Sequence, residues 1–168
     1  AVLCLQSDKC DSQAVANILN GYSRLEMFDE ELFTHLNRIA TEIPSSKFSS
    51  QAIANILNAN AKVGNKDTKL FLHFSRFITS VGHATRDETI LDDSDVDEDP
   101  QEFRSAAGKL VYDTQAIANI LNAFSKLEMK EANIFKHFEE VILSIPDNKW
   151  EAQALALVLN AYAKTDFG

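Results

Sequence analysis

Residues 114–128 read TQAIANILNAFSKLE, and similar stretches occur at three other places in the chain. They are SQAVANILNGYSRLE at 12–26, SQAIANILNANAKVG at 50–64 and AQALALVLNAYAKTD at 152–166. Their glutamines follow one another at intervals of 38, 64 and 38 residues, so the second interval is 26 residues longer than the others. A fixed period of this length is typical of solenoids built from two-helix units. The sequence therefore predicts one domain over residues 1–168, with repeats starting near residues 12, 50, 114 and 152.

The first part of each repeat has the apolar spacing of an amphipathic helix. In the first repeat the predicted apolar stripe is Ala14, Val15, Ile18, Leu19, Tyr22 and Leu25. Hydroxyl side chains stand where a helix needs an oxygen to accept from its first N–H groups. The predicted N-caps are Ser12, Ser50 and Thr114.

The second part of the unit also repeats, as ELFTHLNRIATEIP at 31–44, KLFLHFSRFITSVG at 69–82 and NIFKHFEEVILSIP at 133–146. The matching apolar stripe is Leu32, Phe33, Leu36, Ile39, Ala40 and Ile43. Pro44, Gly82 and Pro146 share one position and are expected to end this second helix. No stretch alternates with period two for long enough to predict a sheet. We therefore expect an all-α protein, an α-solenoid of 38-residue units with a right-handed superhelix.

The extra residues of the second interval predict an acidic insertion loop at 83–108. Residues 86–104 hold nine acidic side chains against two arginines, which is −7 of the whole chain's net charge of −9. The rest of the protein is nearly neutral. Acidic stretches with few apolar residues seldom pack into a core, so a solvated loop between two repeats is expected.

When the repeats are aligned, polar residues also recur at fixed positions and form a polar band. On the first helix of each repeat, glutamine, asparagine and a basic residue recur at spacings of 4, 3 and 4, away from the apolar stripe. The band comprises Gln13, Asn17, Asn20, Arg24, Gln51, Asn55, Asn58, Lys62, Gln115, Asn119, Asn122, Lys126, Gln153, Asn160 and Lys164. Asparagine is a poor helix former, so its recurrence needs a reason.

Two interpretations of the band stay open. It could be a recognition surface, in which amides bind bases or peptide groups and the basic column binds phosphate or carboxylate. It could instead be structural, with amides bonded in a ladder between neighbouring repeats and basic residues favoured at the helix C-termini. The structural interpretation is slightly favoured for the asparagines, and the two are nearly even for the basic column.

The sequence gives no support for catalysis, a cofactor or a small-molecule substrate. A column of His35, His73 and His137 suggests metal binding, but copies in neighbouring units lie about 10 Å apart, too far to share one zinc ion. Packing is the preferred role. The aromatic column Phe48, Tyr112 and Trp150 is expected in the core. Residues 1–10 align with the end of a second helix, which predicts a longer parent protein or ends that bind partners, and no apolar run is long enough to span a bilayer.

The 38-residue period with QAIANILNAFSKLE opening each pair resembles the octotricopeptide and heptatricopeptide repeat families, particularly the RAP-associated organellar repeat proteins of alveolates. The resemblance implies a mitochondrial protein, soluble or membrane-peripheral. It implies a non-enzymatic scaffold or accessory subunit that binds other protein subunits, in an assembly such as a respiratory complex or ribosome. The alternative implied by the same families is an organellar RNA-binding or RNA-processing protein that uses the polar band.

Overall fold

The computed structural model describes residues 11–81, the backbone of 83–85, and residues 110–165. The described part contains seven α-helices of 13 residues each, and it is all-helical apart from one short strand pair. The helices are α1 (Ser12–Arg24), α2 (Glu30–Glu42), α3 (Ser50–Lys62), α4 (Thr68–Ser80), α5 (Thr114–Lys126), α6 (Ala132–Ser144) and α7 (Ala152–Lys164). Three-residue 3₁₀ turns follow α2 at Ser45–Lys47 and α6 at Asp147–Lys149. The predicted helical remnant in residues 1–10 lies outside the described residues.

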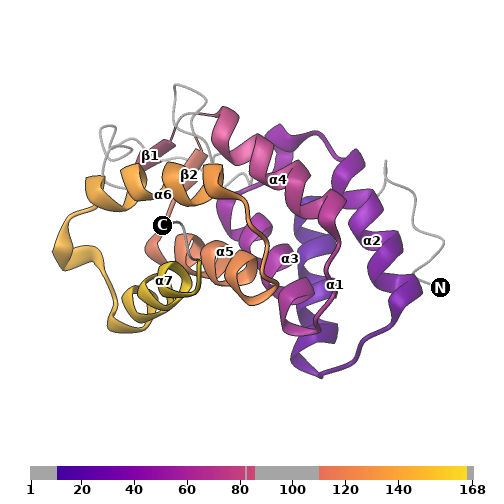
Figure 1. Cartoon of the computed structure of the whole chain (residues 1–168). Coiled ribbons are helices and arrows are strands. Elements are labelled where there is room, and N and C mark those ends of the chain that lie inside the picture. Colours follow the sequence, from indigo (N-terminus) through magenta and orange to yellow (C-terminus); the bar gives the residue numbers. More distant parts are fainter. Residues whose placement is uncertain (1–10, 82, 86–109, 166–168) are drawn as a thin grey trace, which may run out of the picture.

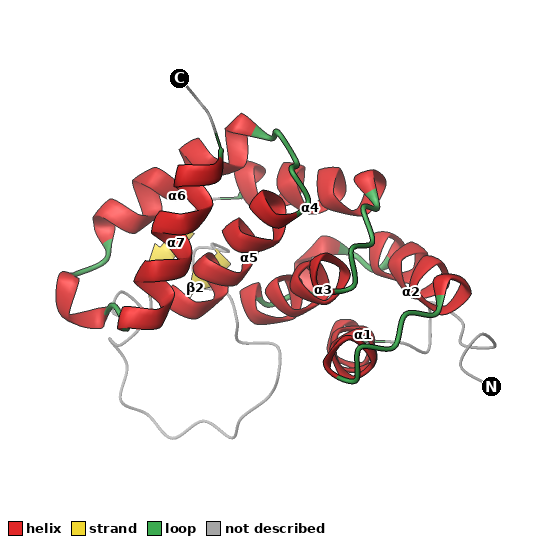
Figure 2. Ribbon diagram, turned by 60° about the horizontal axis from the view of Figure 1, so that its bottom comes forward, coloured by secondary structure: helices red, strands yellow, loops and turns green. Residues whose placement is uncertain are grey.

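The helices form two layers (Figures 1 and 2). Helices α1, α3, α5 and α7, here called the A helices, lie side by side in chain order, and each packs extensively on the next. Helices α2, α4 and α6, the B helices, form the second layer, in which α4 contacts both α2 and α6. One continuous cluster of buried apolar side chains runs through both layers.

The N-caps of the A helices differ by one residue from the sequence prediction. The observed caps of α1, α3 and α5 are Asp11, Ser49 and Asp113, whose side chains accept hydrogen bonds from the N–H groups of Ala14, Ala52 and Ala116 at 2.6, 3.1 and 2.6 Å. Ser12, Ser50 and Thr114 are the first helical residues instead. Ser12 has another role, because its hydroxyl donates to the Lys47 carbonyl at 2.6 Å and ties α1 to the turn after α2.

The apolar stripes were predicted correctly with one exception. All six residues predicted for the stripe of α2 and its end are buried, and Val15 and Leu19 of α1 are fully buried. Leu25 is wrong, because it is 71% exposed. Helix α1 ends at Arg24, so Leu25 caps the helix and its side chain leaves the stripe.

A left-handed residue ends each of three A helices. Glu26, Gly64 and Glu128 have φ of 56°, 75° and 52°. After α1, the Glu26 N–H donates to the Ser23 carbonyl and the Met27 N–H to the Tyr22 carbonyl, and the same pair of bonds follows α3 and α5. This is the Schellman motif, which favours glycine at the left-handed position.

Replacing Glu26 with glycine is expected to raise the free energy of unfolding by about 1 kcal/mol, because glycine adopts positive φ without a Cβ clash. Gly64→Ala is expected to lower it by a similar amount. A Cβ at Gly64 would meet no heavy atom within 4 Å, so that loss would come from the backbone alone. Urea denaturation of the two variants and the parent chain measures both changes. Unchanged stability in both would refute the account.

The B helices end as predicted at two of three positions. Helix α2 ends two residues before Pro44, and α6 ends two residues before Pro146. Gly82, the third member of this column, lies outside the described residues.

The sequence did not predict the short parallel strand pair that joins the two ends of the insertion. Strand β1 (His83–Thr85) pairs with β2 (Leu110–Tyr112), so the first three residues of the predicted 83–108 loop are a strand. Two runs of three residues are too short for period-two alternation to be recognised. Leu110 and Tyr112 of β2 are buried, and β2 contacts α3 while β1 contacts α6. Residues 86–109 lie outside the described residues.

Aromatic side chains connect successive units, as expected for the predicted aromatic column. Phe48 and Tyr112 are each 2% exposed and stack edge-on against Phe74 and Phe138, at ring-centroid distances of 5.1 and 5.2 Å. Trp150, the third member, is only partly buried and packs on the same core.

Candidate functional site

The polar band is present on the A helices, but its amides bond within each helix. Gln13 donates to Asn17 at 2.9 Å, Gln51 to Asn55 at 3.1 Å and Gln115 to Asn119 at 3.1 Å. The ladder between repeats, which was one of the two interpretations of the band, is not observed. In the part of the chain that is described, no side-chain hydrogen bond joins Asn20, Asn58 or Asn122 to a neighbouring helix, and the bonded asparagines Asn17, Asn55 and Asn119 pair with glutamines of their own helices.

Exposure varies along the band. The amide members on α3 and α5 are half-buried, whereas Gln153 and Asn160 on α7 are exposed. The basic members Arg24, Lys62, Lys126 and Lys164 are all exposed at the last turns of their helices. The amides are thus partly engaged in packing, and the basic column is the more accessible part of the band.

Two members of the basic column meet at one cleft. Lys126 and Lys164 line a cavity of about 420 Å³ where the C-terminal ends of α5 and α7 lie together, here called the α5–α7 cleft. Lys130, Glu128 and Ser125 also line it. Within the described residues the only ion pair joins Arg38 and Glu42 on α2, so these three lysines form none there.

A buried amide cluster between α2 and α3 was missed by the sequence analysis. Asn37 and Asn60 are 1% and 0% exposed and bond to each other twice, at 2.8 and 3.0 Å. Asn37 also donates to Asp67 at 3.1 Å, and Asn65 donates to Asn60 at 2.8 Å. The available signal was Asn60 itself, which occupies the repeat position that holds an aromatic residue in the other three units.

The same position elsewhere makes aromatic contacts. Phe124 of α5 stacks edge-on with Phe71 of α4 at 5.0 Å, and Tyr162 of α7 stacks with Phe135 of α6 at 5.4 Å. The Tyr162 hydroxyl also donates to the Phe135 carbonyl at 2.8 Å. Burial, together with the nearby Glu139 carboxylate, raises the pKa of Tyr162 to about 12. This repeat position therefore makes polar contacts on α3 and aromatic contacts on α5 and α7.

Two of the three histidines of the B helices pack as aromatic rings. His73 and His137 stack edge-on against Phe74 and Phe138 at 5.3 and 5.4 Å. Burial lowers the pKa of His73 from its ordinary value of 6.5. His35 has a buried Nε2 without a hydrogen-bond partner. In the described part no three His, Cys, Asp or Glu side chains lie close enough together to hold a metal ion.

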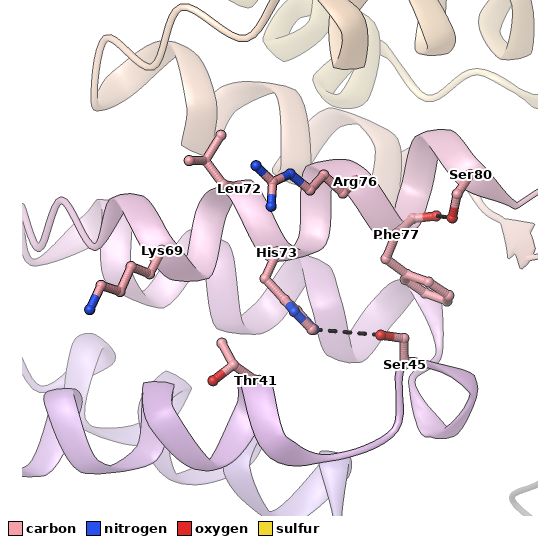
Figure 3. Close-up of a pocket in the computed structure, with 8 residues that line it drawn as sticks. All are labelled: Thr41, Ser45, Lys69, Leu72, His73, Arg76, Phe77 and Ser80. Atoms are coloured by element: carbon pink, nitrogen blue, oxygen red, sulfur yellow. Dashed lines mark hydrogen bonds between the residues drawn. The ribbon is translucent and has the colours of Figure 1, made fainter.

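An open groove of about 640 Å³ runs between α2 and α4 (Figure 3). His73 points toward Ser45 across it, with 3.5 Å between the imidazole Nε2 and the hydroxyl. Lys69 and Arg76 also line the groove, but Figure 3 shows their charged groups pointing in different directions. Their charges therefore do not converge on one ligand.

The outer face of α7 exposes side chains at positions that are buried in the other A helices. This α7 open face consists of Leu155, Ala156, Leu159 and Ala163, all exposed, with Leu155 at 42% and Leu159 at 61%. The leucines at the repeat position of Leu159 in the other A helices are all fully buried, namely Leu19, Leu57 and Leu121. This difference in exposure follows from the position of α7 at the end of the layer. Helices α1, α3 and α5 each have the next A helix packed against this face, and α7 has none in the described structure.

Comparison of the chain with protein-family models finds no match, and comparison with curated proteins finds none. None of the helices in the described part combines the length and the apolar character needed to cross a membrane.

Proposed function

We propose that this chain is a segment of an α-solenoid with two-helix repeats of 38 residues and a right-handed superhelix. In this proposal it is a non-catalytic scaffold or accessory subunit that binds other protein subunits in a larger assembly. The resemblance to organellar repeat proteins favours a mitochondrial assembly, such as a respiratory complex or a ribosome.

The α7 open face is the observation that carries this proposal. At the other end of the layer of A helices, the outward face of α1 is also less buried than the equivalent face of α3. Its Ala14, Ile18 and Tyr22 are only partly buried, whereas the equivalent residues of α3 are fully covered by the preceding unit. Each A helix thus has one face toward the unit before it and one toward the unit after it. Both outward faces are apolar, as expected of surfaces that bind helical partners.

The energetics favour occupation of the α7 open face. Burying a leucine side chain contributes roughly 1.5–3 kcal/mol. Leu155 and Leu159 lie one helical turn apart, with Ala156 between them, so a partner helix can contact both leucines and approach closely over the alanine. The equivalent positions hold isoleucine, alanine and leucine on α3 and α5, and there all of them are fully buried.

RNA binding is the second candidate, and the α5–α7 cleft favours it because two lysines of the basic column meet there. Phosphate contacts dominate the affinity of proteins for nucleic acid. Two observations favour the scaffold instead. Three of the four glutamines of the band are already bonded to asparagines, and no aromatic side chain is interleaved with the basic column to stack on bases.

An RNA titration separates the two candidates. If Arg24, Lys62, Lys126 and Lys164 bind four phosphates, the slope of log affinity against log salt should be roughly −3, from about −0.7 per contact. We expect negligible binding of single-stranded RNA even at low salt. Replacement of all four by glutamine should preserve the helical circular-dichroism spectrum, because these side chains are exposed.

Submicromolar, salt-sensitive RNA binding that the fourfold glutamine variant abolishes would overturn this ranking. Weakened association of the same variant with other protein subunits, without any RNA binding by the parent chain, would support the scaffold.

A further inference from the structure

The α5–α7 cleft has the charge of an anion site. Three ammonium groups, from Lys126, Lys130 and Lys164, line it with one carboxylate, from Glu128. The lining therefore carries two positive charges. All four side chains are exposed, and the ion pair on α2 is the only one within the described residues. The positive charge of the cleft is thus available to a ligand.

The second observation is an unpaired hydroxyl in the same cleft. Ser125 lines the cleft and is 6% exposed, and its Oγ is buried without a hydrogen-bond partner. Leaving a buried hydroxyl unpaired is unfavourable, so such a group is a site where an acceptor would bind. The equivalent Ser23 of α1 differs, because its hydroxyl donates to the Asn20 carbonyl at 2.9 Å.

We propose that the α5–α7 cleft binds a phosphate monoester, with the three lysines neutralising the phosphate and Ser125 donating a hydrogen bond to it. A phosphate monoester carries a charge of about −1.5 to −2 at neutral pH and several acceptor oxygens, which matches the charge of the lining. A phosphodiester of a nucleic-acid backbone carries a single charge and matches it less well. The proposal is independent of what covers the α7 open face.

The other junctions between A helices lack this combination. The junction of α1 and α3 has Phe28 at the position of Lys130, and its serine is already bonded. The junction of α3 and α5 has Lys62, Lys66 and Lys126, but Ala61 replaces the serine. The structural alternative is that lysines at these positions only stabilise the carbonyl ends of the helices. It would apply equally to every junction, whereas the unpaired serine occurs at one.

The test is a titration of the whole 168-residue chain with O-phosphoserine, with inorganic phosphate and with a single-stranded RNA oligonucleotide, at constant ionic strength. Backbone amide NMR shifts locate the binding site. Phosphoserine and phosphate should shift Ser125, Lys126, Lys130 and Lys164 with millimolar affinity. Tighter binding of phosphoserine than of free phosphate would indicate a phosphorylated side chain as the natural source, and the reverse would indicate a small phosphate.

Variants then test the assignment. Lys130→Gln and Lys164→Gln should each weaken phosphoserine binding about fivefold, whereas Lys136→Gln, the same charge change at an exposed position of α6, should not. Ser125→Ala should weaken binding without destabilising the free chain, because the hydroxyl has no partner to lose. Ser23→Ala is the matched control and should leave binding unchanged.

Three results would each overturn the proposal. The first is equal weakening by Lys136→Gln, which would mean non-specific attraction. The second is RNA binding that is tighter than phosphoserine binding at the same residues. The third is loss of stability in the lysine variants with phosphoserine binding unchanged, which would leave the lysines a purely structural role.

Discussion

Replacing Leu121 with alanine should lower the free energy of unfolding by about 2–5 kcal/mol, the usual cost of deleting a buried leucine side chain. The same substitution at Leu159 should cost about 0.5 kcal/mol or less. The two leucines occupy the same position of the repeat, on α5 and α7, but Leu121 is fully buried and Leu159 is 61% exposed. Urea denaturation followed by circular dichroism measures both changes.

The comparison isolates the missing neighbour of α7, since the residue type, the helix position and the flanking sequence are nearly the same. Leu57→Ala on α3 should behave like Leu121→Ala, because Leu57 is also fully buried. A large loss of stability at Leu159 would mean that the α7 open face is covered within this chain, and the basis of the proposed function would be lost.

Replacing Asn37 with leucine should lower the free energy of unfolding by about 1–3 kcal/mol, because the buried Asn60 amide would lose two of its four hydrogen bonds. Asn60→Leu should cost a similar amount for the same reason. The double variant should cost less than the sum, since neither amide then remains to be satisfied. A double-mutant cycle should give a coupling of roughly 0.5–3 kcal/mol.

Asn58→Leu is the matched control, because Asn58 is half-buried on the same helix and its side chain makes no hydrogen bond to another described residue. Its effect should stay within about 0.5 kcal/mol. Strict additivity of the Asn37 and Asn60 substitutions would contradict the cooperative cluster. The cluster stands at the repeat position that makes aromatic contacts on α5 and α7, so the junction between α2 and α3 has a polar pairing instead.

The sequence predicts the helical fold well because the repeat itself provides the evidence. Four copies of one pattern locate the A helices to within a residue, and the apolar stripe of α2 is correct at every position. The N-caps were misplaced because two residues able to cap a helix stand side by side at each start, an aspartate and a hydroxyl residue before α1 and α5 and two serines before α3. Leu25 was misplaced because periodicity alone does not show where the left-handed turn ends the helix.

The candidate site was less predictable, because it depends on contacts between side chains rather than on spacing. The sequence places the residues of the polar band on one face of each helix. It does not show whether their amides form hydrogen bonds within one helix or between neighbouring helices, because that depends on the distances between side chains. The Asn37–Asn60 pair joins residues 23 positions apart, and the α5–α7 cleft depends on Lys164 reaching the end of another helix. The unpaired Ser125 has no signature in the sequence, since Ser23 has the same position and a satisfied hydroxyl.

The most direct test of the scaffold is the size of the native assembly when the α7 open face is changed. Leu155→Asp/Leu159→Asp is compared with Leu143→Asp, since Leu143 on α6 is 80% exposed and the equivalent residues Thr41 and Thr79 are polar. Size-exclusion chromatography of extracts from cells that make the protein is the measurement. Parent chain and Leu143→Asp should elute within a large assembly, and the double variant as a free, folded chain. Retention of the double variant in the assembly, or elution of the parent as a free chain, would contradict the account.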